Sequence, residues 1–298
     1  MERIGTSSVL DPIDPAALET VVYWIREREA IRRAKEAGMP KPWTRDPLLR
    51  DFRWCCVRRL DDKVSRELMT GWYADGQPAE QLVAAALGRL INWPEALFEA
   101  TGNAPFRLGA LPGMRIALHA RAARPAKIFT GAYVCPGVTG KNKVDSTLDL
   151  VELISARADQ IIRPTLKETW ARLVELDGLG SFLAGQIVAD LAHLSTGAKW
   201  ADRISWAPVG PGSARGMNRL RGRPKTKPLP QDQFDEELAE FSETLRPLVA
   251  DIAIDRQLGA ADFQSVCCET DKYFRLRGAE GKVRAKYDGA GELQGSLL

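Results

Sequence analysis

The stretch Leu173–Leu191, LVELDGLGSFLAGQIVADL, decides the fold class that we expect for this chain. Its first half is amphipathic and runs into a Gly-Leu-Gly turn, and a second apolar pattern at three-and-four spacing begins at Ser181. Two helices joined by such a turn form a helix–hairpin–helix. The amides at the start of the second helix can bind a nucleic-acid phosphate. We therefore predict DNA contact through Gly178, Gly180 and Ser181, and the alternative is an αα corner whose glycines serve only packing.

Helical periodicity also dominates the rest of the chain. Apolar residues recur at helical spacing in seven segments: Ala16–Ala37, Asp61–Trp72, Gln81–Asn92, Val144–Ala158, Thr165–Leu176, Ser181–Leu194 and Gln233–Leu258. The best strand candidate, Ile128–Cys135, is short and interrupted by glycine. We expect an all-α chain with one compact body, which can consist of two interlocked helical lobes. Residues 1–19 would be an N-terminal extension, 20–288 the helical domain and 289–298 a loosely ordered tail.

Composition excludes few function classes. The 298 residues are 45% hydrophobic, and 42 basic against 39 acidic residues give a net charge of +3. A DNA-binding surface would therefore need local segregation of charge. No stretch has the length and apolarity of a membrane span or signal peptide, so we expect a cytoplasmic protein without a membrane partner. Five cysteines and two histidines without a C-x-x-C motif disfavour zinc or iron–sulfur sites, and we expect no metal and no cofactor.

Charge is segregated in one segment, 206–228, WAPVGPGSARGMNRLRGRPKTKP, which has six basic residues and no acid. Its prolines and glycines predict a shaped loop in the first half, and a short helix after it would align several side chains. Backbone amides and guanidinium groups suit phosphate. The phosphate-binding candidates are Gly212, Ser213, Arg215, Asn218 and Arg219. The candidates for contact with the DNA backbone are Arg221 and Arg223. A solvated basic loop is the alternative.

Several motifs, in order over residues 20–288, resemble the phage α-glutamyl/putrescinyl thymine pyrophosphorylase family. They are WIREREAIR, CCVRRLDDKVSR, INWP, KIFTGAY, LDGLGSFLAGQIVADL, APVGPGSARGMNRLRGRP and CCETDKYFRLRGAEGKVRAKY. That family is related to the helical domain of 5-hydroxymethyluracil DNA kinases and to the helix–hairpin–helix DNA glycosylase superfamily. In the glycosylases an aspartate follows the hairpin at the mouth of the base pocket, and Asp202 occupies that place.

The resemblance implies a glycosylase-like fold and an enzyme of thymine hypermodification in bacteriophage DNA. Such an enzyme replaces the phosphate, or pyrophosphate, of phosphorylated 5-hydroxymethyluracil with an amine, either from an amino acid such as glycine or from a polyamine. Its partners would be double-stranded DNA carrying that base, the free amine and the DNA base kinase. The chain itself lacks the G-x-x-x-x-G-K-[ST] motif of a P-loop kinase.

The chemistry needs a base that is flipped out of the duplex, a group that removes a proton from the amine, and cations for the leaving group. We expect Asp202 to be the proton acceptor or to orient the amine, with a helix cap as the alternative. Lys127 would face the phosphate and Tyr133 would stack on the base, unless both belong to a buried connector. The resemblance suggests that Glu269, near Lys272, holds the amino group; a surface salt-bridge series is the alternative.

Arg58 and Arg59 precede two aspartates, so an anion site and an internal ion-pair brace remain equally open. Two other functions also remain open. One is a glycosylase that excises a modified base. The other is a non-catalytic DNA-binding module that recruits the kinase.

Overall fold

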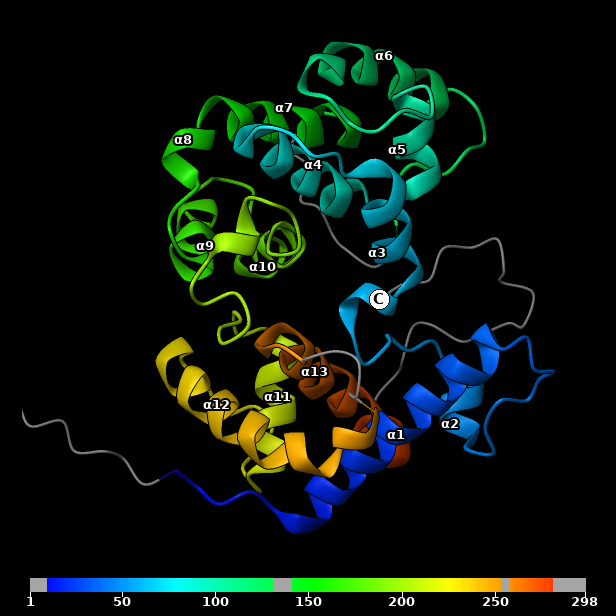
Figure 1. Ribbon diagram of the computed structural model, residues 1–298, viewed down its shortest axis with the longest axis vertical. Helices are drawn as coiled ribbons and strands as arrows, with labels where there is room; N and C mark the ends of the chain where they lie inside the picture. Colours follow the sequence, from blue (N-terminus) through cyan, green and yellow to red (C-terminus); the bar gives the residue numbers. More distant parts are fainter. Residues whose placement is uncertain (1–9, 131–140, 253–257, 281–298) are drawn as a thin grey trace, which may run out of the picture.

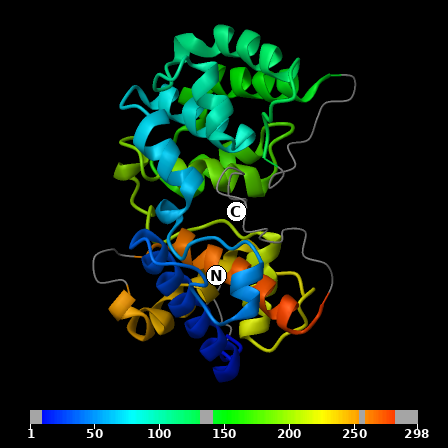
Figure 2. The ribbon, with the colours of Figure 1, turned by 90° about the vertical axis from the view of Figure 1, so that its right-hand side faces the viewer.

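The computed structural model describes residues 10–130, 141–252 and 258–280. Within these residues the chain is helical and contains no β-strand, which confirms the all-α expectation. Residues 128–130, at the start of the strand candidate, have no regular structure, and 131–135 lie outside the described residues. The helices form two lobes, one above the other, each around its own hydrophobic core (Figures 1 and 2).

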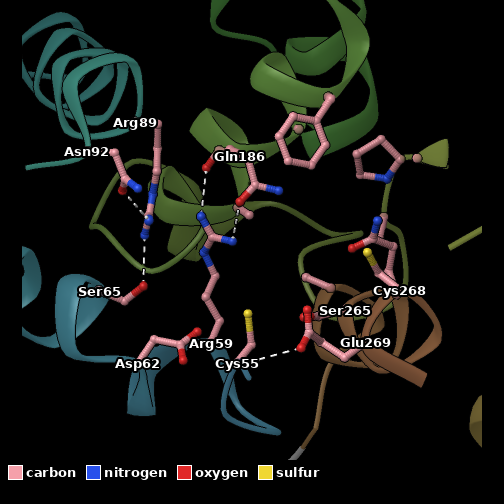
Figure 3. Close-up of a pocket in the computed structure, with 18 of the residues that line it drawn as sticks. Cys55, Arg59, Asp62, Ser65, Arg89, Asn92, Gln186, Ser265, Cys268 and Glu269 are labelled. Carbon is pink, nitrogen blue, oxygen red and sulfur yellow. Dashed lines mark hydrogen bonds between the residues drawn. The ribbon is translucent and has the colours of Figure 1, made fainter. Parts of the chain in front are cut away.

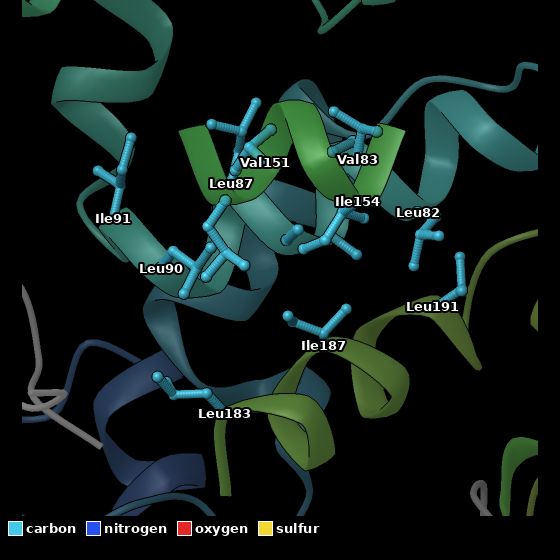
Figure 4. Packing of buried hydrophobic residues seen from close by; sticks show 14 of the residues in the cluster. Leu82, Val83, Leu87, Leu90, Ile91, Val151, Ile154, Leu183, Ile187 and Leu191 are labelled. Carbon is cyan, nitrogen blue, oxygen red and sulfur yellow. The ribbon is translucent and has the colours of Figure 1, made fainter. Parts of the chain in front are cut away.

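The central lobe, named for its place in the sequence, has a core drawn from residues 64–206. Its helices are α3 (Lys63–Glu67), η2 (Leu68–Trp72), α4 (Pro78–Ile91), α5 (Pro94–Ala100), α6 (Leu111–Ala122), α7 (Lys143–Ala156), α8 (Ala158–Ile161), α9 (Leu166–Val174) and α10 (Ser181–Leu191), with short 3₁₀ turns η1 (Arg59–Asp61), η3 (Leu108–Ala110) and η4 (Gly197–Lys199). Every residue of α4 from Gln81 to Ile91 is buried, because α7 and α10 cover it on different sides (Figure 4).

The terminal lobe combines both ends of the described chain, since its core is drawn from residues 17–57 and 207–273. It contains α1 (Pro15–Glu36), α2 (Pro47–Asp51), α11 (Pro211–Leu220), α12 (Gln231–Leu248), η5 (Ala250–Ile252) and α13 (Ala260–Arg277). Two segments therefore cross between the lobes: one follows α2 and the other precedes α11. The terminal lobe is therefore discontinuous in the sequence, and the central lobe is inserted between its two parts.

The two helices and the connecting turn expected over residues 173–191 are present. Helices α9 and α10 are joined by a turn in which Gly178 has φ +84°, a left-handed conformation that favours glycine. Leu179 is buried, and the indole Nε1 of Trp170 donates to the Ser181 carbonyl at 3.1 Å. The turn is therefore held from inside, while Gly180 and Ser181 begin α10.

The short helix expected in the basic segment is α11, and it begins at Pro211, within the residues expected to form a loop. Pro211 stands in the first turn, where a missing N–H costs nothing, and Ser213 Oγ accepts the Gly210 N–H at 2.9 Å. Gly212 and Gly216 lie against α13; a Cβ on Gly216 would come within 2.0 Å of the Cys267 carbonyl oxygen. The glycines therefore permit close helix packing here and do not form a phosphate-binding turn.

Other boundaries also differ from expectation. Helix α1 begins at Pro15, inside the residues expected to form an extension. The helix expected over 61–72 is divided into α3 and the π-helical turn η2, and α12 ends at Leu248. The expected tail, 289–298, lies outside the described residues. None of the described helices has the combination of length and apolarity needed to cross a membrane.

A candidate active site between the lobes

A cavity with both apolar and polar lining lies where the two crossing segments pass between the lobes (Figure 3). Its volume is about 110 Å³, and it is lined by the first crossing around Cys55 and Arg59, by α4 and α10, by the second crossing at 207–210, and by α13. An engineered cavity of about 150 Å³ holds a benzene molecule. The cavity is therefore about large enough for one ring or one small amine.

Arg59 brings a guanidinium group to this cavity. Its Nε donates to Asp190 Oδ1 at 2.9 Å, and its Nη atoms donate to the side chain and the carbonyl of Gln186 at 2.8 and 3.2 Å. Three of the five N–H groups are thus used within the described chain, and two remain for a ligand. These bonds tie the first crossing to α10, as the ion-pair alternative expects, and the phosphate-binding role of Arg59 stays a prediction.

Asp190, on α10, anchors Arg59 from below the cavity surface. This fully buried carboxylate also accepts two bonds from Arg89, at 2.5 and 2.6 Å, and one from the Tyr73 hydroxyl at 2.5 Å. Burial alone would raise the pKa of Asp190, but the charges of Arg89 and Arg59 lower it well below its usual range. Asp190 is therefore ionised in the folded protein, and it holds the side chains of Arg59, Arg89 and Tyr73 in place.

Two further carboxylates line the cavity, and they accept the backbone N–H groups of two consecutive residues. Glu269 Oε2 accepts the Cys55 N–H at 3.2 Å, and Asp62 Oδ1 accepts the Cys56 N–H at 2.8 Å. Burial raises the pKa of Asp62 to about 6, against the opposing effects of the Cys56 N–H, Arg59 and Arg28. The site thus contains a carboxyl group that can change protonation near neutral pH.

The remaining polar lining is neutral. Amide and hydroxyl groups from both lobes face the cavity, among them Asn92, Gln264 and Ser265. Cys55 and Cys268 also line it, and burial raises the pKa of Cys268 to about 12 and also raises that of Cys55. Both side chains are thiols at neutral pH and so are poor nucleophiles. Among the described residues, no group of three or more His, Cys, Asp and Glu side chains could hold a metal ion.

Of the other residues expected in the site, Lys272 lies at its edge and Arg58 lies elsewhere. Lys272 Nζ is 3.5 Å from Glu269 Oε2 and 4.4 Å from the centroid of the Trp54 ring. Arg58 is buried and pairs with Asp61 and Glu29, each at 2.8 Å. Arg58 is therefore an ion-pair brace, whereas its neighbour Arg59 faces the cavity.

The arginines of the basic segment are paired with carboxylates, contrary to the expected phosphate grip. Arg215 and Arg219 share buried Asp271, at 2.8 and 2.9 Å. Arg223 donates twice to Glu237 at 2.6 Å. The sequence hid these pairs because α12 and α13 supply the acids from distant positions.

Two more residues of this segment are also structural. Arg221 is buried, with its Nη2 2.8 Å from Glu240 and its Nε 3.6 Å from Glu237. Buried Asn218 donates to the Lys227 carbonyl at 2.8 Å and so holds the following loop. The expected assignments of Arg221 and Arg223 to DNA contact are wrong for this conformation, because a buried, paired guanidinium presents no charge to a ligand.

Asp202 does not line the cavity. Its two carboxylate oxygens accept the N–H groups of Leu166 and Lys167, at 2.7 and 2.9 Å, so it caps α9 from a distant loop. This geometry favours the helix-cap alternative over the catalytic one. Lys127 lies 4.0 Å from the centroid of the Trp93 ring, and partial burial with the charge of Arg53 lowers its pKa. Tyr133 lies outside the described residues.

No sequence pattern singled out Asp62, Gln186 or Gln264 as site residues. Asp62 was one of two adjacent aspartates in a mixed-charge motif, and only the structure separates Asp61, which braces Arg58, from Asp62, which faces the cavity. The available signal was the adjacency of Arg59 and Asp62 to the cysteine pair, in a motif that the family resemblance already included.

Comparison with known families agrees with this two-lobed helical architecture. The family "5-hmdU DNA kinase, helical domain" matches residues 15–283, which include both lobes and the cavity. The chain belongs to this family. The 5-hmdU DNA kinase helical-domain family connects the chain with 5-hydroxymethyluracil in DNA and with its modification. No curated protein and no solved structure matches the chain.

Proposed function

We propose that the protein is a transferase that replaces the phosphate, or pyrophosphate, of phosphorylated 5-hydroxymethyluracil in bacteriophage DNA with an amine. The observation that carries the proposal is the cavity between the lobes, where Asp62 and Glu269 face the same space as the guanidinium of Arg59. The family match supports 5-hydroxymethyluracil in DNA as the context of the reaction.

The cavity contains the groups that this reaction requires. The C5 substituent of a uracil is crowded within a duplex, so the base would be flipped out to enter a pocket between the lobes. Amide side chains such as Gln264 and Asn92 can bond its polar edge. The two remaining N–H groups of Arg59 can stabilise the departing phosphate, since hydrogen bonds to charged oxygens in a buried site are strong.

The hairpin would hold the DNA next to this cavity. Helix α10, whose first turn carries the hairpin amides, also contributes Phe182, Gly185 and Gln186 to the cavity lining. Phe182 is 38% exposed, so an aromatic ring stands at the opening close to where the helix begins. A phosphate bound at Gly178–Ser181 and a base in the cavity would thus be held by one rigid element. This arrangement supports a helix–hairpin–helix mode of DNA binding.

The proposal is tested by incubating the purified protein with duplex DNA that carries 5-phosphomethyl-deoxyuridine, together with a mixture of amino acids and polyamines. The DNA is then digested and the nucleosides are weighed by mass spectrometry. A nucleoside that has lost phosphate and gained an amine supports the transferase and names the donor. Free base with abasic DNA would establish a glycosylase instead. DNA binding without any change of mass would favour a module that recruits the kinase.

A further inference from the structure

Asp62 occupies a helix-cap position without capping the helix. It immediately precedes α3 and has extended backbone angles of φ −66° and ψ 137°, as an N-cap residue should, yet its side chain makes no cap hydrogen bond. An aspartate at this position ordinarily accepts an N–H from the first turn and stabilises the helix by about 1 kcal/mol. Here the carboxylate turns instead toward the cavity and accepts the Cys56 N–H. Capping of α3 therefore does not explain why an aspartate occupies this position.

The position of Asp62 relative to Glu269 is fixed by the backbone. Consecutive N–H groups, of Cys55 and Cys56, donate to Glu269 and Asp62. Glu269 comes from α13 of the terminal lobe, whereas Asp62 begins the central lobe. In Figure 3 the two carboxylates flank Cys55, with Arg59 rising between them. Two carboxylates that line one cavity suit a cationic group, and an alkylammonium is the cation that the proposed reaction consumes.

The two carboxylates differ in their surroundings. Glu269 accepts the Cys55 N–H and has Lys272 Nζ at 3.5 Å, while that ammonium group donates its hydrogen bond to the Arg53 carbonyl. The Cys56 N–H and the cations Arg59 and Arg28 lower the pKa of Asp62. Burial and the anion Glu269 raise it, and the raising effects are the larger. Burial and Glu269 both favour the protonated form of Asp62. Asp62 can therefore gain and lose a proton near neutral pH.

We propose that Asp62 removes the proton from the attacking amine, while Glu269 holds the ammonium group beside it. This inference rests on the proposed transferase function and assigns its general base. The donor R–NH₃⁺ gives one proton to the Asp62 carboxylate and becomes R–NH₂. The nitrogen lone pair forms the C–N bond to the C5 methylene carbon as the C–O bond breaks, and phosphate leaves with that electron pair. Asp62 then passes its proton to the phosphate, and the product is a secondary ammonium.

The test compares Asp62→Asn with the wild type and with Asp251→Asn, which makes the same chemical change at an exposed carboxylate far from the cavity. Asparagine keeps the oxygen that accepts the Cys56 N–H, so the substitution removes the proton affinity and preserves the anchor. We expect kcat at neutral pH to fall by about 10²- to 10⁴-fold, with the affinity for duplex DNA and the thermal midpoint retained. Asp251→Asn should keep the wild-type rate.

A pH series separates proton removal from a structural role. The wild-type rate should rise as Asp62 ionises, around pH 6, and then level off. The rate of Asp62→Asn should keep rising about tenfold per pH unit at alkaline pH, as solvent supplies the free amine. An Asp62→Asn rate within about threefold of an active wild type, or a loss of rate that persists at every pH, would overturn the assignment.

If Asp62→Asn does not fold, the pH dependence of the wild-type rate tests the role of Asp62. A wild-type rate that does not change slope near pH 6 overturns the inference. A wild type that is inactive with every amine instead refutes the proposed function itself, so the two failures are distinguishable.

Discussion

Replacing Asp190 with asparagine should be among the most destabilising single changes in this protein. The substitution removes one negative charge from a site where Arg89 and Arg59 both depend on it, and their side chains are only 4% and 15% exposed. Breaking a buried ion pair by removing one partner costs about 3–5 kcal/mol, because the remaining charges stay desolvated. Domains are stable by only about 5–15 kcal/mol. For chains of this size, 1 kcal/mol corresponds to roughly 2–4 °C, so the thermal midpoint should fall by roughly 6–20 °C.

The assay is thermal and urea unfolding followed by circular dichroism at neutral pH. Asp251→Asn is the matched control, because it breaks the exposed Arg26–Asp251 pair and should leave the midpoint unchanged. The difference between the variants should also shrink at low pH. The folded-state pKa of Asp190 is lowered, so its contribution is present above the unfolded pKa, about 3.9, and is lost as pH falls through the folded value. An Asp190→Asn midpoint equal to that of the control would refute the argument.

Three further outcomes follow from the packing and the ion pairs. Gly216→Ala should lower the unfolding free energy by about 3 kcal/mol, because the new Cβ would meet the Cys267 carbonyl. Gly113→Ala should raise it by about 0.5–1 kcal/mol, because nothing lies within 4 Å of the new Cβ. Urea titrations measure both changes. Asp202→Ala should cost about 1 kcal/mol through the lost cap and leave turnover intact; a folded but inactive variant would restore its catalytic role. Arg223→Met should cost about 3 kcal/mol but leave the salt dependence of DNA affinity unchanged, and a shallower dependence would show that Arg223 contacts phosphate.

Local patterns in the sequence were enough to predict most of the helices. The segments that became α1, α4, α7, α9 and α10 have apolar residues at helical spacing, and the hairpin glycine Gly178 adopts the left-handed conformation that such a turn requires. These features depend on neighbours three or four residues apart, which a sequence displays directly. The start of α11 was placed too late because the glycines and prolines before Arg215 suggested a loop, whereas Pro211 opens the helix and Gly216 serves the contact with α13.

The site depended on contacts that no local pattern carries. From the sequence, Arg59 and Glu269 were each candidate site residues, but their meeting with Asp62 in one cavity requires the chain to cross between the lobes twice. The same long-range folding neutralised Arg215 and Arg223 with acids from α13 and α12, so a basic run in the sequence is a set of internal ion pairs in the fold. The sequence determined which helices form and which side chains are available. Tertiary structure alone decided which charges are cancelled within the protein and which face the cavity, because charge pairing depends on distance in space and on burial.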